Sequence, residues 1–151
     1  MNWTTYAFLS ALFAGLTAVL AKVGVADISS NLATLIRTAV ILLFAAALVF
    51  ARGEHQGLST LTPRNWAFLV LSGVATGLSW LFYFAALKHG PVSHVAPIDK
   101  LSFVIAMVLG ILVLGENTTP LTALGAALIL AGALLTLPTT QEALKRLVSG
   151  N

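Results

Sequence analysis

Long apolar runs recur along the whole chain, and they constrain its fold more than any other feature. A helix that crosses the hydrocarbon core of a bilayer needs roughly 20 apolar residues. The sequence offers five such stretches, namely Trp3–Val25, Ser30–Ala51, Arg64–Leu87, Val92–Leu114 and Thr119–Leu137. Each must be helical in lipid, because hydrocarbon offers no hydrogen-bond partner to a free backbone group. The runs therefore predict an all-α membrane protein with five transmembrane helices.

Composition excludes a soluble fold of this length. The 151 residues are 58% hydrophobic and 9% charged, whereas soluble domains carry about 25% charged residues. A soluble domain of this size has too little interior to hide so many apolar side chains from water. We therefore expect the lipid bilayer itself to be the main partner of the chain, in the cell membrane of a bacterium or an archaeon.

Short polar segments with Gly and Pro separate the runs and define the domain organisation. Residues 1–138 form one predicted five-helix transmembrane domain, and residues 139–151 form a short polar tail. The tail carries Glu142, Lys145 and Arg146 among leucines, a pattern typical of a short interfacial helix. The first run is too long for a signal-peptide core and no Lys or Arg precedes it, so we expect a retained helix.

An odd number of spans predicts that the two termini lie on opposite faces of the membrane. We call the N-terminal face A and the other face B. The basic residues at or beyond the ends of the spans then divide two to four, with Arg52 and Arg64 on face A and Lys22, Lys88, Lys145 and Arg146 on face B. This small bias favours a cytoplasmic face B and is weak enough to be compatible with insertion in both orientations.

Several function classes are excluded by the same sequence. Lys and Arg are scattered singly rather than in a basic stripe, which argues against a nucleic-acid partner. The chain has no Cys, and His55, His89 and His94 lie in or beside loops without the spacing of a metal site. We expect solvated histidines, no metal and no cofactor. No span carries paired carboxylates or a nucleophile–base arrangement, so an enzyme is not expected.

Three charged residues lie well inside predicted spans, away from the helix ends, where a charge costs several kcal/mol and marks a candidate functional site. They are Arg37, Asp99 and Lys100. Each lies seven or eight residues from the face-B end of its helix, which is roughly 10–12 Å at about 1.5 Å per residue. Thr17 and Trp80 lie at a similar depth. Four helices thus contribute to one predicted polar layer near face B.

Helical periodicity groups these residues further. Asn31, Thr34 and Arg37 share one sector of the second span, and Asp99 shares a small and polar stripe with Ser102 in the fourth. Asp99 is then placed either to pair with Arg37 across a cavity or to form a structural ion pair with Lys100. Pro97 removes a backbone hydrogen bond just before Asp99, which predicts a kink and a freed carbonyl.

Several of these residues also have a purely structural interpretation. Lys22 near a helix end is expected to snorkel, and Arg37 either snorkels in the same way or binds a substrate. Trp80 and Tyr83 serve either as core and belt aromatics or as stacking surfaces for a ligand. Small residues in the later spans predict close helix contacts; they are Gly73 and Gly77 in the third span, and Gly125, Ala127, Ala131 and Gly132 in the fifth.

Three stretches carry a resemblance to a known family. The join of the third and fourth spans runs from Tyr83 to Ile98, the fourth span ends in Leu114-Gly115-Glu116, and a Gly-rich segment from Gly125 to Gly132 follows. In this order and spacing the chain resembles EamA-type transporters of the drug/metabolite transporter superfamily, over about residues 3–137.

The resemblance implies an assembly larger than one chain. Most relatives carry two five-helix repeats in opposite orientations, whereas this chain has one, which implies that two chains form a ten-helix bundle as a homodimer or heterodimer. The related small multidrug-resistance proteins assemble as antiparallel homodimers through their last helix, and Gly125 and Gly132 match the glycine spacing there. Their essential first-helix Glu has no counterpart in Trp3–Val25. Asp99 and Lys100 also depart from the mostly uncharged family pattern.

Two function hypotheses follow. In the first, the chain is a secondary transporter of a small metabolite or drug-like solute, either an antiporter or a symporter. It works by alternating access as a dimer, and one version of this hypothesis has the two subunits antiparallel. Asp99 then serves as the protonatable or cation-coupling group, while Arg37 and Lys100 attract an anionic part of the substrate. In the second, the chain is a non-transporting auxiliary subunit that assembles with another membrane protein.

Overall fold

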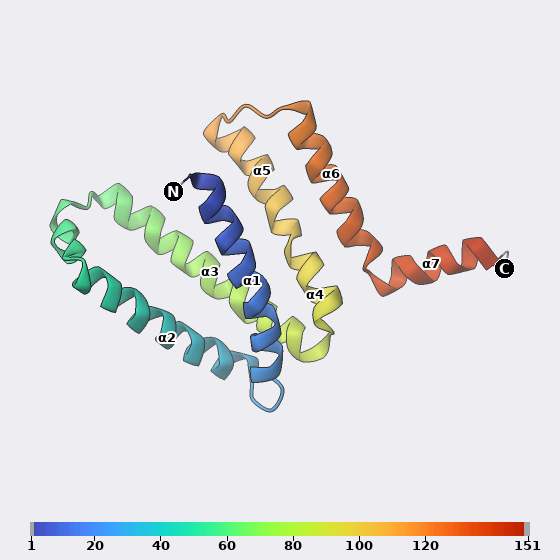
Figure 1. The fold of residues 1–151 in the computed structure, drawn as a ribbon, viewed down its shortest axis with the longest axis horizontal. Helices are drawn as coiled ribbons and strands as arrows, with labels where there is room; N and C mark the ends of the chain where they lie inside the picture. The colour runs from blue at the N-terminus through green and yellow to red at the C-terminus, as the bar shows by residue number, and fades with distance from the viewer. Residues whose placement is uncertain (1, 150–151) are drawn as a thin grey trace. The chain divides into compact units, whose positions relative to one another are not determined.

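The computed structural model describes residues 2–149, and every regular element in this range is a helix (Figure 1). The elements in chain order are α1 (Trp3–Gly24), α2 (Ser30–Ala51), the 3-10 helix η1 (Glu54–Thr60), α3 (Pro63–His89), α4 (Val92–Asp99), α5 (Leu101–Leu114), α6 (Pro120–Leu135) and α7 (Pro138–Ser149). Met1, at the start of the predicted domain, and Gly150 and Asn151, at the end of the predicted tail, lie outside the described residues.

The all-helical membrane class is confirmed. Within the described chain, α1, α2, α3 and the combined span Val92–Leu114 are each long and apolar enough to cross a membrane. The predicted fifth span is shorter than expected, because α6 has 16 residues and reaches only about 24 Å at 1.5 Å per residue. It counts as a fifth crossing only together with α7, across a bend of 81°.

The helices group into two compact units, one holding α1 to α3 and the other α4 to α7. In the first unit, polar side chains define where helices begin. The Ser29 hydroxyl accepts from the Leu32 N–H at 3.2 Å before α2. Thr62 and Asn65 exchange hydrogen bonds before α3, with the Thr62 N–H donating to the Asn65 carbonyl oxygen at 3.0 Å. Both arrangements satisfy N–H groups that have no partner inside the helix.

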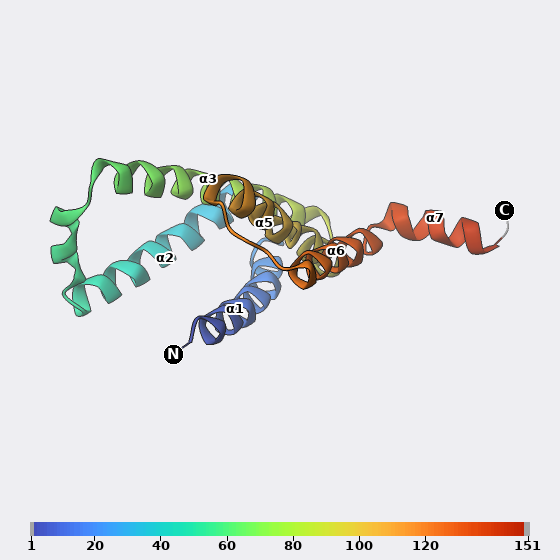
Figure 2. The same cartoon turned by 90° about the horizontal axis from the view of Figure 1, so that it is seen from above.

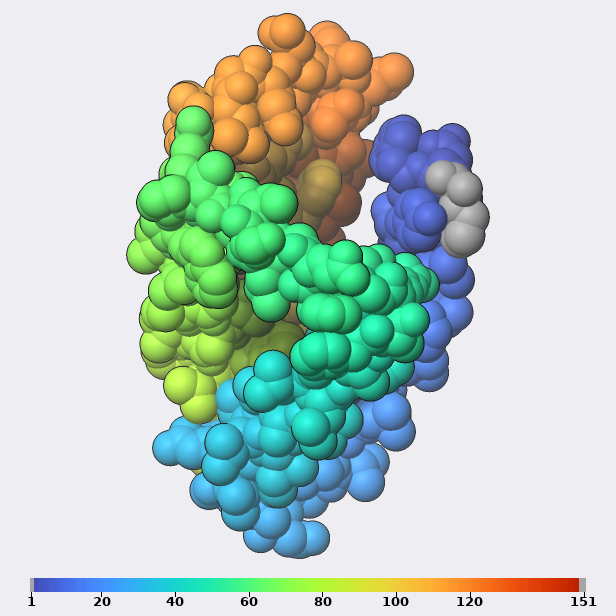
Figure 3. Space-filling model, turned by 90° about the vertical axis from the view of Figure 1, so that its left-hand side faces the viewer, coloured from blue at the N-terminus to red at the C-terminus, as the bar shows by residue number. Residues whose placement is uncertain are grey.

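The core of the first unit lies at its face-B end. Val25, Phe84 and Leu87 are almost fully buried there, where α2 and α3 pack closely and α3 also contacts α1. Figures 1 and 2 show α2 and α3 diverging from this end toward η1. Figure 3 looks onto the opposite end, where the connection (teal to green) crosses from α2 to α3.

His55, in η1, departs from the expectation of a solvated side chain. Its ring lies 5.2 Å from the Phe50 ring, centroid to centroid. Its Nδ1 atom is shielded from water and has no hydrogen-bond partner among the described residues. The cause is local, because the short 3-10 turn after Gly53, which adopts a positive φ of 69°, folds the loop back toward the end of α2.

The second unit contains a broken helix. Helix α4 ends at Asp99, Lys100 forms a turn, and α5 begins at Leu101. Pro97 lies three residues before this turn, and it removes the backbone donor that would bond the Ser93 carbonyl. The one-residue interruption lies at the two charged residues of the span, whereas the kink and the freed carbonyl stay predictions.

The Leu-Gly-Glu segment closes α5 through its backbone. Gly115 adopts a positive φ of 68°, the conformation that glycine enters without steric cost. The N–H groups of Gly115 and Glu116 both donate to the Gly110 carbonyl, the latter at 3.1 Å. Thr119 then caps α6, and Pro120 occupies its first turn.

Helix α6 presents two different small-residue faces. Ala126 and Ala133 are buried within the unit, where α6 contacts α4 and α5. A Cβ atom added at Gly125 or Gly132 would meet nothing within 4 Å. A Cβ atom added at Gly73 or Gly77 on α3 would also meet nothing within 4 Å. The close helix contacts predicted at Gly73 and Gly77 are therefore not formed within the first unit.

Helix α7 is amphipathic. Leu144, Leu147 and Val148 share one side and are 44%, 79% and 88% exposed, while Glu142 and Arg146 lie on the opposite side of the wheel. The bend of 81° directs α7 across the axis of α6, as Figures 1 and 2 both show. An apolar face beside a charged face, perpendicular to a membrane helix, is typical of a segment in the bilayer interface.

We expect single-cysteine variants to locate the two faces of α7. The chain has no native Cys, so an environment-sensitive fluorophore can be attached to Leu144→Cys or to Arg146→Cys in liposomes. The Leu144→Cys label should emit at shorter wavelength because it enters the acyl boundary, and the Arg146→Cys label at longer wavelength because it faces water. Equal emission from both positions would show that α7 does not lie in the interface.

Candidate functional site

The candidate site is built around Arg37, which lies about two turns into α2 from face B. Its guanidinium carbon lies 4.5 Å from the centroid of the Trp80 ring and 5.6 Å from that of Phe84. Trp80 and Phe84 are four residues apart, so both rings project from one side of α3. Stacking on aromatic faces stabilises a cation, more so where it is withdrawn from water. The side chain is thus held inside its unit by two rings.

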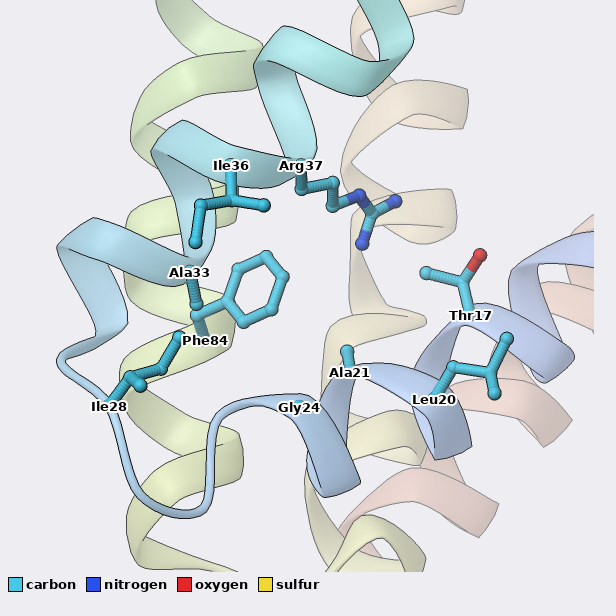
Figure 4. Close-up of a pocket in the computed structure, with 9 residues that line it drawn as sticks. All are labelled: Thr17, Leu20, Ala21, Gly24, Ile28, Ala33, Ile36, Arg37 and Phe84. Carbon is cyan, nitrogen blue, oxygen red and sulfur yellow. The ribbon is translucent and has the colours of Figure 1, made fainter.

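A pocket opens between α1 and α2 beside this guanidinium, which we call the α1–α2 pocket (Figure 4). Its volume is about 370 Å³. Its lining consists of Thr17, Leu20, Ala21 and Gly24 from α1, Ile28 from the following loop, Ala33, Ile36 and Arg37 from α2, and Phe84 from α3. The four α1 positions recur at helical spacing and form one face. In Figure 4 the Arg37 head and the Thr17 side chain approach the pocket from opposite walls.

The charge of Arg37 has no acidic counterpart within its own unit. The carboxylates of this part of the chain are Asp27 and Glu54, both outside the helical spans. A carboxylate oxygen of Glu54 lies 3.9 Å from a guanidinium nitrogen of Arg52. Among the described residues of this unit, no carboxylate forms an ion pair with Arg37.

Two lysines near the pocket are already engaged. Lys22 Nζ donates to the Leu87 carbonyl in the last turn of α3, and Lys88 Nζ donates to the Ile28 carbonyl at 2.8 Å. A cation at these positions satisfies carbonyls that lack an intrahelical donor and complements the negative end of the helix dipole. Lys22 therefore joins α1 to α3 rather than only extending toward the interface.

A second hollow, the α2–α3 groove, continues from the Trp80 ring toward face A. It has a volume of about 460 Å³ and is lined by one face of each helix: Thr38, Ile41, Leu42 and Ala45 from α2, and Leu69, Ser72, Gly73, Thr76, Gly77 and Trp80 from α3. The small residues on α3 leave space here, whereas the rings of Trp80 and Phe84 fill it nearer face B. Trp80 thus lies between the groove and the α1–α2 pocket.

The structure brings together part of the predicted polar layer. Thr17 and Arg37 line the α1–α2 pocket, and Trp80 stacks on Arg37. Tyr83 follows Trp80 by three residues on α3. Thr34 is buried and donates to the Ser30 carbonyl at 2.9 Å. Asn31 is exposed and is not part of the pocket lining.

The remaining predicted residues belong to the second unit. Lys100 Nζ lies 3.3 Å from Asp99 Oδ2, with the Asp99 side chain 34% exposed and that of Lys100 58%. The pair occupies the break between α4 and α5, and Ser102 is exposed one turn further on. The Asp99–Lys100 ion pair considered from the sequence is thus formed, whereas a pairing of Asp99 with Arg37 stays a prediction.

Sequence reasoning missed Phe84 and the α1 face that completes the pocket. The signal for Phe84 was its spacing of four residues from Trp80, which places both rings on one side of a helix. The α1 residues Leu20, Ala21 and Gly24 carry no comparable signal, because apolar and small residues are common throughout membrane helices. Among residues 2–149, no group of three His, Cys, Asp or Glu side chains is placed to hold a metal ion.

Comparison with known proteins points to a family of membrane transporters. Residues 1–137 match the EamA-like transporter family. A protein of Sinorhizobium sp. named "Uncharacterized transporter in cobO 3'region" is 57% identical over 134 residues, which is 89% of this chain and 95% of the relative. No solved structure matches.

We expect Lys22→Met to destabilise the protein by about 2 kcal/mol, the typical contribution of a hydrogen bond from a charged donor in a partly buried place. Lys88→Met is the matched control, because its hydrogen bond to the Ile28 carbonyl is exposed, and its effect should be under about 1 kcal/mol. Thermal unfolding in detergent, followed by circular dichroism, measures both. Equal losses of stability in the two variants would show that the Lys22–Leu87 hydrogen bond contributes no more than the exposed one.

Proposed function

This chain belongs to the EamA-like transporter family, and from that membership we propose that it is one subunit of a secondary transporter of a small solute. Two five-helix chains assemble and expose a shared site alternately to the two sides of the membrane. Secondary transporters are commonly built from two related repeats with the substrate site between them near the bilayer midplane. A single repeat supplies half of such an arrangement.

The relative has about the same length as this chain. The alignment covers 95% of that protein and 89% of this chain, so the Sinorhizobium transporter is itself of single-repeat length. A transporter of this size needs a second subunit to complete a two-repeat architecture. The proposal therefore includes a dimer, formed by two copies of this chain or by one copy and a related chain.

The observation that carries the proposal is the Arg37 guanidinium. It borders a pocket of about 370 Å³, rests on two aromatic rings, and has no acidic partner in its own unit. A charge inside a membrane span is expensive and is retained where it has a function. A mobile anionic group is the partner that a transporter provides, and Arg37 then contributes substrate attraction rather than stability.

Asp99 and Lys100 are proposed as the coupling element. Their ion pair lies at the interruption between α4 and α5, and interrupted helices at ion and substrate sites are a recurring feature of secondary transporters. A carboxylate that pairs with a neighbouring lysine can exchange this partner for a proton or another cation. Such an exchange links the occupancy of the site to the conformation of the broken helix.

We expect transport to depend on both charges. Proteoliposomes containing the purified chain are exposed to a defined mixture of small anions, cations, zwitterions and neutral solutes, and the entrapped solutes are measured by mass spectrometry. At least one solute should enter faster than in protein-free liposomes. Arg37→Ala and Asp99→Asn should each slow its entry at least about tenfold, because each removes a charged hydrogen-bonding group.

The matched control is Arg64→Ala. Arg64 also lies over an aromatic ring, 5.8 Å from the centroid of Phe68, but it is at the start of α3 and outside both hollows. Its replacement should leave transport unchanged. If the intact protein moves none of the solutes yet copurifies stoichiometrically with another membrane protein, the auxiliary-subunit hypothesis replaces this one.

The glycine face of α6 is the proposed dimer contact. Gly125 and Gly132 face open space in the subunit and are seven residues apart, which keeps them on one side of the helix. Faces of small residues allow membrane helices to approach closely. Gly132→Leu should therefore lower the crosslinked or co-purified dimer fraction by more than half while leaving the subunit folded.

Ala127→Leu is the comparison variant for the dimer. Ala127 is exposed and lies on roughly the opposite side of α6 at about 100° per residue, so its enlargement should spare the dimer. The reverse pattern would move the contact to the alanine face that holds Ala127 and Ala131. Labelling of Ser149→Cys by an impermeant thiol reagent from both sides of the membrane would identify an antiparallel homodimer, and labelling from one side would require a parallel dimer or an oppositely inserted partner.

A further inference from the structure

The chemistry of the α1–α2 pocket defines a substrate class, and this inference rests on the proposed transport function. We propose that the pocket binds a compact monoanion, a single carboxylate or comparable group on an apolar body. Arg37 holds the anionic head, Thr17 supplies a hydroxyl on the facing wall, and the apolar body lies against the remaining lining.

The charged residues around the pocket determine how many anionic groups the ligand carries. Arg37 is the charged residue of the pocket lining. Lys22 and Lys88 lie nearby, but their ammonium groups already donate to the carbonyls of Leu87 and Ile28. One guanidinium balances one negative charge and can form two parallel hydrogen bonds with a carboxylate. A second anionic group on the same ligand would be left in an apolar place without a counterion.

The residues that line the pocket determine the chemistry of the rest of the ligand. Apart from Arg37 and Thr17, the side chains around the pocket are apolar: leucine, isoleucine, alanine, glycine and phenylalanine. Phe84 is 3% exposed and offers its ring to the cavity. A sugar, a polyol or a nucleoside would have to abandon hydrogen bonds to water without finding new ones, at a cost of about 1–3 kcal/mol for each buried group. Apolar carbon is stabilised in the same place.

Size restricts the ligand further. The volume of about 370 Å³ lies near the lower end of the roughly 300–1,000 Å³ that small-molecule sites occupy. The Trp80 ring stands behind the guanidinium at 4.5 Å, so the head of Arg37 has limited freedom to retreat from a larger ligand. The single guanidinium, the apolar lining and the volume of the pocket together favour a small carboxylic acid with an apolar ring or branched chain.

The same geometry provides a binding signal that does not require transport. The chain has three tryptophans, and Trp3 and Trp66 are 77% and 51% exposed at the starts of α1 and α3. In the variant Trp3→Phe/Trp66→Phe, Trp80 is the remaining tryptophan, in contact with the Arg37 head. An anion that engages Arg37 changes the environment of this ring and therefore its emission.

The test titrates this variant, in detergent, with cyclohexanecarboxylate, the neutral cyclohexanecarboxamide and the cationic cyclohexylmethylamine, none of which absorbs where tryptophan is excited. We expect saturable change with the carboxylate and at least about tenfold weaker binding of the amide and the amine. Cyclohexane-1,2-dicarboxylate should also bind at least about tenfold more weakly than the monoacid, because its second charge has no partner.

Variants of the two arginines complete the test. Arg37→Gln should weaken carboxylate binding at least about tenfold and leave the amide unaffected, and Arg64→Gln should change neither. Arg37→Lys, which keeps the charge, should retain selectivity for the carboxylate over the amide. Because the comparison of carboxylate with amide uses the protein with Arg37 intact, the proposal remains testable if Arg37→Gln does not fold.

The outcomes separate this inference from the proposed function. Equal affinity for carboxylate and amide, stronger binding of the diacid, or no binding of the monoacid would overturn the substrate class. Each of these results leaves transport of another solute class to be found in the proteoliposome assay. Saturable, Arg37-dependent binding without movement of the acid in proteoliposomes would retain the site and overturn the transport function.

Discussion

Hydrocarbon offers no hydrogen-bond partner to a polar group, and the rest of this structure depends on that constraint. It requires long helices wherever the chain crosses the bilayer, and it makes every departure from helix or from apolar composition costly. Two such departures are prominent in the described chain. Arg37 places a full charge within α2, and the turn at Lys100 breaks the fourth span beside an ion pair. Arg37 belongs to the first unit and the turn at Lys100 to the second.

Side-chain size along one face of α3 organises the first unit. Trp80 and Phe84 close the space against α2 near face B, whereas Gly73, Thr76 and Gly77 leave a groove toward face A. The glycines therefore create space within the unit instead of closing it. The two aromatic rings also hold the Arg37 head at the border of the α1–α2 pocket. One helix face thus sets both hollows and the position of the charge between them.

Two lysines near the pocket have structural partners, which distinguishes them from Arg37. Lys22 and Lys88 satisfy carbonyls at the ends of helices and loops, a role that explains their position without a ligand. Arg37 instead rests on aromatic rings beside an apolar pocket. In the function that we propose, a monoanion supplies the missing negative charge and the Asp99–Lys100 pair is the coupling element. Family membership itself supports only a role in transport.

The membrane class, the boundaries of most helices and the family could all be predicted from the sequence. Apolar length and backbone chemistry are local properties, so Ser30–Ala51 and Val92–Leu114 were predicted to the residue. The shortened α6, the shielded Nδ1 atom of His55 and the open glycine faces were not predictable in this way. Only the tertiary structure decided that Arg37 stacks on Trp80 and Phe84, that Lys22 joins α1 to α3, and which face of α1 completes the pocket. Those outcomes depend on how one helix rotates and tilts against another, and apolar side chains that look alike in sequence do not specify that rotation.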